Sequence, residues 1–271
     1  MLKEILENVR AKMPLVHNIT NYVTVNDCAN ILLACGASPI MADDLEEVED
    51  ITSICSGLNI NIGTLNKMTI SAMLAAGKKS NELNHPVLLD PVGAGASKLR
   101  TDTAKELLEK VKFSVIRGNL SEIKSLALGN GNTRGVDSVE YINEENLDTV
   151  IDFAKDFALK NSAIAVITSV VDIVTDGKTA YCVYNGDKIM SRITGSGCQL
   201  SAMMAAYISA NTDNILEAAL ACVCAMGLCG EIAKNRMTDK DGNSSYRNYL
   251  IDAVYNLTPD ELEKGARYEI R

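Results

Sequence analysis

The segment 193–200, ITGSGCQL, places small residues and a cysteine at the predicted start of a helix. Free backbone N–H groups at a helix start, together with the helix dipole, stabilise negative charge. Gly195 and Gly197 let these groups approach a phosphate, and the same groups can stabilise charge that develops during its transfer. Gly195, Ser196 and Gly197 are therefore candidate catalytic residues. A simple N-cap by Thr194 or Ser196 is the alternative, and it is compatible with an anion site.

Cys198 follows these residues, and a helix start lowers the pKa of a thiol, so a thiolate is plausible there. A cysteine hydrolase would also need a nearby base, usually histidine. The chain has two histidines, of which His85 precedes Pro86 at the entry of a predicted strand, and His17 lies in the stretch PLVHNITN. Support for a nucleophile and base pair is thin. We expect Cys198 to accept or relay a proton beside the anion site.

Asp90 ends the predicted strand in LLDPVGAGAS, residues 88–97, where two glycines permit close backbone approach. The sequence lacks the third glycine of a dinucleotide-binding fingerprint, because position 98 is lysine. A turn in which Asp90 caps backbone amides is the structural alternative. The functional interpretation pairs Asp90 with Glu122, which follows another predicted strand. Magnesium favours one or two carboxylates plus water and substrate phosphates, and these two residues suit it.

The stretch VIRGNLSEI, residues 115–123, offers two further kinds of group. Asn119 and Glu122 have the spacing of a capping box, and they could also orient a hydrated magnesium ion. Arg117 could reach a nucleotide phosphate, or it could form a surface ion pair. Thr168, in VITSVVD, could contact a phosphate through its hydroxyl, although a plain strand-end threonine is as good an explanation.

Short aliphatic runs alternate with helical patterns along the chain, which predicts an α/β doubly wound, mostly parallel sheet with helices on both faces. The ligand crevice of such a sheet lies beyond the carboxyl ends of its strands. We expect a hairpin turning at Asn185-Gly186, an almost wholly helical chain after residue 198, and a single domain over residues 1–271. The predicted strands are 57–63, 86–90, 113–118 and 163–169, and the predicted helices are 66–80, 101–112 and 146–160.

Composition excludes several classes of protein. A net charge of −9 and a pI near 4.9, without a basic stripe, argue against nucleic-acid binding. The amino terminus lacks an apolar signal core, and the apolar run 218–230 is too short to span a bilayer, so we expect no membrane contact. The eight cysteines form no CxxC pair, which predicts free thiols in a reducing cytoplasm and makes a zinc site improbable.

Six motifs of this chain occur in the order and spacing of one enzyme family. The chain resembles the hydroxyethylthiazole kinases of the ribokinase-like superfamily from about residue 3 to its carboxyl-terminal helices. The first and last of these motifs are specific, whereas DPVGAG also occurs in related vitamin kinases. The motifs are PLVHNITNYVTVNDCANILLACGASPIMAD (14–43), LNINIGTL (58–65), PVLLDPVGAGAS (86–97), VIRGNLSEI (115–123), AVITSVVD (165–172) and ITGSGCQLSAMMAA (193–206).

The resemblance implies a cytoplasmic kinase that phosphorylates the hydroxyl of 5-(2-hydroxyethyl)-4-methylthiazole with ATP and Mg²⁺, salvaging thiazole for thiamine synthesis. It also implies a homotrimer with active sites between subunits. The implied substrate residues are Met41, Asn21 and the backbone of Gly195. By the same resemblance Arg117 and Thr168 bind ATP, while Asp90, Glu122 and Asn119 manage magnesium and phosphate. Cys198 takes the place of the aspartate base of the broader sugar kinases.

Two departures from the family pattern accompany the resemblance. Ser196 stands where threonine or alanine is common, which should preserve the N–H site. The segment 237–247 replaces a glycine- and proline-rich helix opening, so nucleotide contacts from it are in doubt. Two other functions remain open at this stage. One is a sister kinase acting on a pyrimidine or pyridoxal alcohol, and the other is an inactive homologue that binds thiazole or nucleotide.

Overall fold

The computed structural model describes residues 1–127, 142–143 and 145–271. One nine-stranded sheet runs through this part of the chain in the order β2-β1-β3-β4-β5-β6-β7-β8-β9. The first six strands pair in parallel, as the alternation of aliphatic and helical segments predicts. These strands are β1 (Leu15–Ile19), β2 (Ser38–Met41), β3 (Gly57–Asn61), β4 (Val87–Asp90), β5 (Val115–Asn119) and β6 (Ile164–Thr168).

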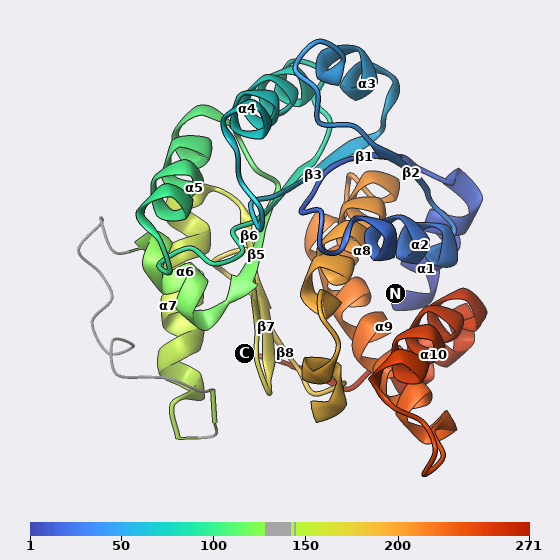
Figure 1. Ribbon diagram of the computed structural model, residues 1–271. Helices are drawn as coiled ribbons and strands as arrows, with labels where there is room; N and C mark the ends of the chain where they lie inside the picture. Colours follow the sequence, from blue (N-terminus) through green and yellow to red (C-terminus); the bar gives the residue numbers. More distant parts are fainter. Residues whose placement is uncertain (128–141, 144) are drawn as a thin grey trace.

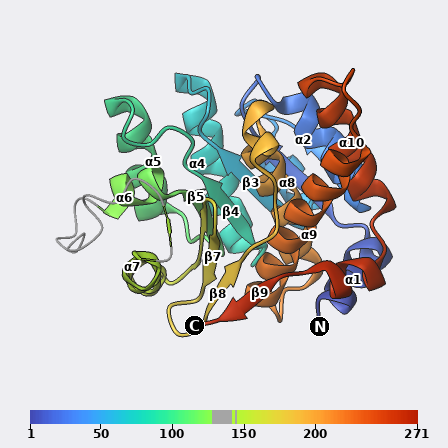
Figure 2. The ribbon, with the colours of Figure 1, turned by 90° about the horizontal axis from the view of Figure 1, so that it is seen from below.

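Helices cover both faces of the sheet, so the predicted doubly wound architecture is confirmed (Figures 1 and 2). Each layer of helices buries its own hydrophobic cluster against the strands. One layer contains α3 (Val48–Ile54), α4 (Lys67–Glu82), α5 (Lys98–Lys110), α6 (Leu120–Ala127) and α7 (Leu147–Asn161). The other contains α1 (Leu2–Lys12), α2 (Val25–Cys35), α8 (Ser196–Ala210), α9 (Ile215–Arg236), α10 (Asn243–Asn256) and α11 (Pro259–Gly265).

The antiparallel edge of the sheet differs from the predicted hairpin. Strands β7 (Asp172–Thr175) and β8 (Ala180–Val183) form the hairpin, and β9 (Tyr268–Ile270) pairs with β8 from the far end of the chain. The expected turn at Asn185-Gly186 is wrong. The Asn185 side chain binds backbone groups of Gly265 and Arg267 instead, and β9 takes the sheet edge that a returning strand would need.

The predicted helix starts are correct to within a few residues. Helix α4 has the capping box of Asn66 and Thr69, and α7 begins at Leu147. Helix α5 starts three residues before its predicted start, because Ser97, rather than Thr101 or Asp102, accepts the hydrogen bond that caps it. Strands β1 and β2 were not among the elements predicted.

Helix α9 contains the apolar run 218–230, and its length and composition would suffice to cross a membrane. In the fold it packs against α8 and α10, and 67% of its most apolar window is buried. It is therefore a core helix, as its sequence predicts. All eight cysteines are free and buried, which agrees with the expectation of unpaired thiols.

Helix α8 sets the position of the candidate site. The would-be Cβ of Gly57, at the start of β3, meets the hydroxyl of Ser209 near the end of α8, while Asn61 at the end of β3 contacts Cys198 in the first turn of α8. The helix therefore runs antiparallel to the strand beneath it. This arrangement brings the start of α8 to the carboxyl edge of the parallel strands, where ligands bind in such sheets.

Candidate active site

The start of α8 presents free backbone amides. Gly195 precedes the helix with φ 79°, and the first intrahelical bond outside the opening turn runs from the Gln199 amide to the Gly195 carbonyl. The amides of Ser196, Gly197 and Cys198 occupy the first turn, whose N–H groups have no intrahelical acceptor. No side chain caps this helix in the described structure, so the alternative of an N-cap by Thr194 or Ser196 is wrong.

The two glycines of this turn are required for different steric reasons. A Cβ on Gly195 would lie 2.2 Å from Cγ2 of Thr24, in addition to the strain of its positive φ. A Cβ on Gly197 would lie 2.5 Å from a guanidinium nitrogen of Arg117. Gly197 therefore lets the first turn of α8 pack directly against the buried cation.

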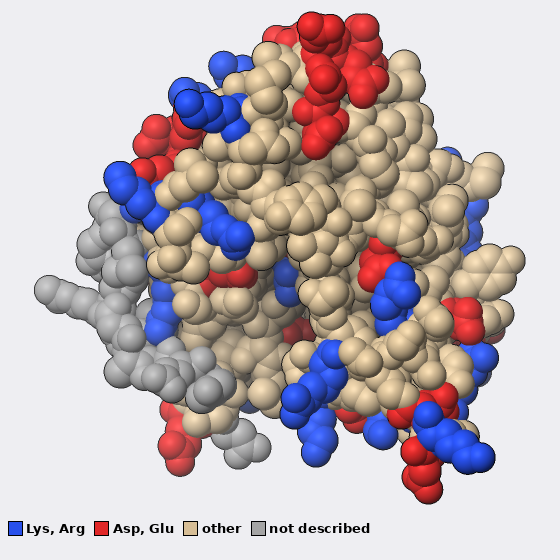
Figure 3. Space-filling view, in the orientation of Figure 1, with Lys and Arg blue, Asp and Glu red and all other residues tan. Residues whose placement is uncertain are grey.

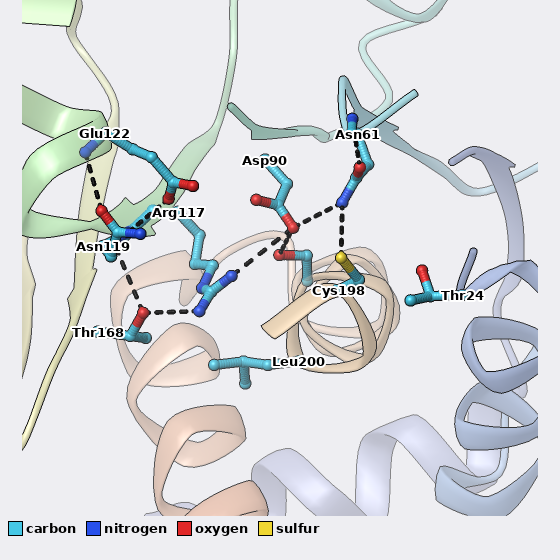
Figure 4. A network of polar contacts seen from close by, with 12 residues as sticks. Thr24, Asn61, Asp90, Arg117, Asn119, Glu122, Thr168, Cys198 and Leu200 are labelled. Atoms are coloured by element: carbon cyan, nitrogen blue, oxygen red, sulfur yellow. Dashed lines mark hydrogen bonds and ion pairs between the residues drawn. The ribbon is translucent and has the colours of Figure 1, made fainter. Parts of the chain in front are cut away.

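Arg117 and Asp90 lie side by side at the carboxyl edge (Figure 4). The Arg117 guanidinium is 3.7 Å from Oδ2 of Asp90 and donates to the Thr168 hydroxyl at 2.6 Å. The Arg117 side chain is almost wholly buried, so the alternative of a surface ion pair is wrong. Its Nε has no partner within the described structure. A buried cation with an unused donor beside free helix amides suits a polyphosphate.

Asp90 is completely buried, and its hydrogen bonds converge on one oxygen. Oδ2 accepts from Asn61 and from Ser201, each at 2.8 Å, whereas Oδ1 has no partner within the described structure. Burial raises the pKa of Asp90 to about 6, against the opposing effect of Arg117. The carboxylate binds side chains and does not cap backbone amides, which removes the structural alternative.

Glu122 and Asn119 form the predicted capping box at the start of α6. The Glu122 carboxylate accepts from the backbone amide of Asn119, and the Asn119 side chain accepts from the amide of Glu122. The other oxygen of Glu122 accepts from the Gly93 amide at 2.8 Å. Glu122 thus joins the loop after β4 to the helix after β5. Its negative charge also contributes to the raised pKa of Asp90, so the two carboxylates face a common region.

These oxygens can be tested against the needs of magnesium. No group of three or more His, Cys, Asp or Glu side chains gathers within the described residues, so the chain offers no complete protein cage for a metal. Magnesium usually keeps several waters and takes only one or two carboxylates. The unpartnered Oδ1 of Asp90 and the carboxylate of Glu122 fit that requirement.

Cys198 is buried among amide donors. Its sulfur accepts from Nδ2 of Asn21 at 3.2 Å and from Nδ2 of Asn61 at 3.3 Å. Burial and the charge of Asp90 raise the pKa of Cys198 above its ordinary value, despite these donors. The raised pKa argues against the expected thiolate at this helix start, because loss of solvation and the nearby Asp90 disfavour the charged form.

A hydrolase pairing is also wrong within this chain. The ring nitrogens of His17 lie 2.9 Å from the Ala42 carbonyl oxygen and 3.0 Å from the Thr52 hydroxyl. His85 is at the amino end of β4, on the opposite edge of the sheet from Cys198. Neither histidine can serve the thiol as a base.

A cavity of about 660 Å³ adjoins this cluster, and Figure 3 shows the molecule hollowed near the centre of the same face. Arg117 and Thr168 line it together with Ser196 and Gly197. Residues 237–247 contribute nothing to its lining. The rest of the lining mixes charged side chains with apolar ones. The charged members are Asp172, Asp187 and Lys188, and the apolar members include Val170, Met190, Leu200, Val223 and Met226.

The acidic segment 43–50 lies away from this cavity. Figure 3 shows acidic side chains gathered at the top of the molecule, over the region of α3, whereas the hollow lies below them. The cavity itself carries both signs of charge, because Asp172 and Asp187 line it along with Arg117 and Lys188.

The structure brings together most of the predicted site residues but leaves one apart. Asn21, Asp90, Arg117, Thr168 and Cys198 belong to one network of contacts. Met41 ends β2, the edge strand, and packs against the hydrophobic cluster on the α8 side. Two strands separate it from β4, and no hydrogen bond or ion pair joins it to the cluster in the described structure.

Sequence reasoning missed three side chains of this cluster. Asn61 and Ser201 hold Asp90, and Thr24 packs on Gly195 and donates a hydrogen bond to Asn21. One signal was present in the sequence. The predicted strand GLNINIG carries two asparagines that would be buried within a parallel sheet, where an amide needs a partner.

Comparisons with known proteins agree on one family. A sequence profile of the hydroxyethylthiazole kinase family matches residues 6–260. The hydroxyethylthiazole kinase of Clostridium acetobutylicum is 66% identical over 271 residues, 99% of each chain. That of Clostridium beijerinckii is 52% identical over 260 residues, 96% of this chain and 94% of its own.

Solved structures lead to the same fold. The structure of a hydroxyethylthiazole kinase protein from Pyrococcus horikoshii superposes with a TM-score of 0.89 at 32% identity, over 100% of this chain and 98% of that one. Pyridoxal kinase from Staphylococcus aureus has a TM-score of 0.62 at 14% identity, over 95% of this chain and 97% of its own. The second likeness concerns the ribokinase-like fold alone.

Proposed function

The chain belongs to the hydroxyethylthiazole kinase family, and from this premise we propose that it transfers the γ-phosphoryl group of ATP to the hydroxyl of 5-(2-hydroxyethyl)-4-methylthiazole. The product is the thiazole phosphate used in thiamine synthesis. The observation that carries this proposal is the convergence of free amides at the start of α8, the buried Arg117 and the carboxylate of Asp90, in a chain 66% identical to a named kinase of this kind.

Positioning and charge stabilisation account for most of the catalysis of phosphoryl transfer, and this site has the parts for both. The amides of Gly195, Ser196 and Gly197 would stabilise the charge on the transferred group, as an oxyanion hole does. Arg117 and Thr168 would hold the ATP phosphates in the cavity that they line. The apolar side chains of its lining would take the nucleotide base. The thiazole alcohol would lie beside Asn21 and Gly195, with its hydroxyl toward Cys198.

Magnesium would be held by Asp90 and Glu122, with Asn119 orienting Glu122 through the capping box. When bound, the ion would neutralise negative charge on the phosphates. This assignment is supported by the unpartnered Oδ1 of Asp90 and by the carboxylate of Glu122, which faces the same region.

We assign Cys198 a modest role. Because burial raises the pKa of its thiol, it is a weak proton acceptor at neutral pH. A loose transition state tolerates this, since the hydroxyl proton can leave late. Replacing the thiol (Cys198→Ala) should lower kcat by about 100-fold, the lower end of general-base effects, and leave thiazole binding intact. Full activity in this variant would remove the proton-acceptor role.

We also propose a cytoplasmic homotrimer with sites between subunits. The position of Met41 supports this arrangement, because it lies at the outer edge strand, away from the cluster to which the family resemblance assigns it. Sedimentation velocity of the purified chain would give its oligomeric state. A monomer at the concentrations of the kinetic assay would rule out shared sites.

An ADP-release assay with and without the thiazole alcohol tests the main proposal. We expect release that depends on the alcohol and on magnesium, with a phosphomonoester product seen by ³¹P NMR. Pyridoxal and the hydroxymethylpyrimidine alcohol serve as competing substrates in the same assay. Preference for either would favour a sister vitamin kinase, and tight thiazole binding without turnover would favour an inactive homologue.

A further inference from the structure

We propose that Asn61 is a positioning residue that holds Asp90 and Cys198 as one unit. The proposal rests on the proposed function, because it concerns two residues of the transfer site. Asn61 ends β3 and is buried, with 1% of its surface exposed. Its Nδ2 donates to Oδ2 of Asp90 at 2.8 Å and to the sulfur of Cys198 at 3.3 Å (Figure 4). One nitrogen thus joins a carboxylate on β4 to a thiol on α8.

The orientation of the Asn61 amide is set on both sides. Its Oδ1 accepts from Nδ2 of Asn21 at 3.0 Å and from the Gly63 amide at 2.9 Å. An amide has two N–H donors and a carbonyl with two acceptor positions, so all four positions are filled. Turning the amide over would place oxygen against Asp90 and nitrogen against two donors. The Asn61 amide can therefore take only the orientation in which it donates to Asp90 and Cys198.

This orientation has two consequences for the site. Oδ2 of Asp90 accepts hydrogen bonds from Asn61 and Ser201 and forms the ion pair with Arg117. Oδ1 is therefore the oxygen that remains available to a ligand. The sulfur of Cys198 receives two amide donors, which fixes its position beside Asp90. Asn61 therefore determines which oxygen of Asp90 faces the ligand region and where the sulfur of Cys198 lies beside it.

Other charged and titratable groups also act on this pair. Arg117 on β5 and Glu122 on α6 act on Asp90, in opposite directions. Asp90 on β4 and Cys28 on α2 both act on Cys198. None of these contacts is made by the Asn61 side chain, so a change at residue 61 leaves them in place.

Asn59 provides a matched control. It lies on the same strand and the same face, is also fully buried, and donates from its amide to Oδ1 of Asn18 at 3.0 Å. It has no hydrogen bond to Asp90 or Cys198 in the described structure. Asn59→Ser therefore removes the same side-chain atoms and a hydrogen bond of the side-chain amide, as Asn61→Ser does, but it changes no contact of Asp90 or Cys198.

The first test compares crystal structures of the protein without ligands. In Asn61→Ser, the Asp90 carboxylate and the Cys198 side chain should leave their wild-type positions, because the nitrogen that joins them is lost. In Asn59→Ser, both side chains should keep those positions. Unchanged positions of Asp90 and Cys198 in Asn61→Ser would overturn the proposal, whether or not the chain is a kinase.

A second variant guards against misfolding of the first. Asn61→Asp has the same shape and keeps the bonds accepted from Asn21 and Gly63, but it loses both donated bonds. Its crystal structure should show the Asp90 carboxylate turned away from residue 61, because an acceptor has replaced the donor that faced it. An Asp90 side chain in its wild-type position would contradict the proposed donor role.

The second test is kinetic. Asn61→Ser should lower kcat by about 100-fold and leave the KM for the thiazole alcohol nearly unchanged, because a misplaced Asp90 and Cys198 act on the transfer step. Asn59→Ser should change neither constant. An equal loss of kcat in both variants would reduce Asn61 to a packing role. Absence of thiazole-dependent activity in the wild type would refute the proposed function, while the crystal structures would still decide on Asn61.

Discussion

Gly195 shows how a single residue can be required by two constraints at once. Its φ of 79° favours glycine, and the methyl group of Thr24 occupies the space that a Cβ would need. Gly195→Ala should therefore displace the first turn of α8 together with its amides. A misplacement of this kind should lower kcat by about 100-fold.

The control for this prediction is Gly242→Ala, also at the residue before a helix. Gly242 has negative φ, and no atom lies within 4 Å of the position of its Cβ. Steady-state kinetics with ATP and the thiazole alcohol would compare the two variants. Equal kcat in Gly195→Ala and the wild type would mean that the turn before α8 does not set the transfer geometry.

Cys198 illustrates why residue-level rules conflict. A helix start lowers a thiol pKa and burial raises it, and the sequence shows only the first of these influences. In the fold the sulfur is buried beside Asp90, so burial and a like charge prevail. The chemistry of this cysteine could be predicted only after its surroundings were known.

At the scale of elements, the turn between β6 and β7 carries a stability cost that depends on pH. Burial raises the pKa of Asp172 from 3.8 to about 7. Because the unfolded chain ionises at lower pH, the favourable contribution is complete below about pH 4 and is lost as pH rises to about 7. Asp172→Asn should match the wild-type Tm near pH 4 and exceed it by about 3 °C at pH 8.

Thermal unfolding at the two pH values measures this difference. Asp213→Asn, in an exposed turn between α8 and α9, is the control and should shift the Tm equally little at both. A Tm difference for Asp172→Asn that does not change with pH would show that its carboxyl titrates normally in the folded state.

An ion pair between Arg247 and Asp27 joins helix α10 to helix α2. The guanidinium binds both oxygens of a carboxylate that is 6% exposed. Arg247→Ala would leave this charge buried and unpaired, which should cost about 2–3 kcal/mol of unfolding free energy. Urea denaturation would measure the change.

The matched comparison for this pair is Arg236→Ala. Arg236 lies on α9, stacks on Tyr249 of α10 and pairs with Asp252, but both charged side chains are about half exposed. Its loss should cost at most about 1 kcal/mol. If Arg236→Ala destabilised the protein as much as Arg247→Ala, burial of Asp27 would not be the cause.

Sequence patterns predicted the interior elements of this fold better than its edges. Strands β3 to β6 are buried on both faces, and their continuous aliphatic runs mark them. The expected hairpin at Asn185-Gly186 failed because β9, more than 80 residues away, occupies the sheet edge. Local turn chemistry carries no information about such a distant partner.

At the scale of the whole molecule, sites shared between subunits make a specific prediction about mixed assemblies. Met41→Asp and Gly195→Ala should each impair activity when expressed alone. If a site takes Met41 from one subunit and Gly195 from its neighbour, co-assembly of the two variants restores some native sites. Random mixing would restore about one quarter of them.

The two variants carry different affinity tags and are co-expressed, so that purification through both tags selects mixed assemblies. The measurement is the kcat of these assemblies per chain. Activity equal to the sum of the separate variants would place both residues in the site of one subunit. The control mixes Arg117→Ala with Gly195→Ala. Both residues belong to the same network in one chain, so every chain carries one of the two changes in its own site and the mixture should restore no native sites.

The candidate site was predictable in its residue types but not in its connections. Polar residues after buried strands identified Asp90, Arg117 and Thr168, because carboxyl ends of parallel strands share one edge. Asn61 was missed because the predicted strand 57–63 ran past it, whereas β3 ends at this residue, and Ser201 was missed because it lies inside a helix. Their role depends on the antiparallel packing of α8 on β3, which is a property of the assembled fold.

Because all eight thiols are buried, the rate at which each one is alkylated measures how often the structure around it opens. An alkylating reagent added to the native protein can modify a cysteine only after the surrounding structure separates from it. Peptide mapping of the labelled sites over time would therefore rank the helices and strands by how often each one parts from its neighbours. The order in which the cysteines of α2, α8 and α9 become alkylated would be recorded without introducing any new cysteine or label into the chain.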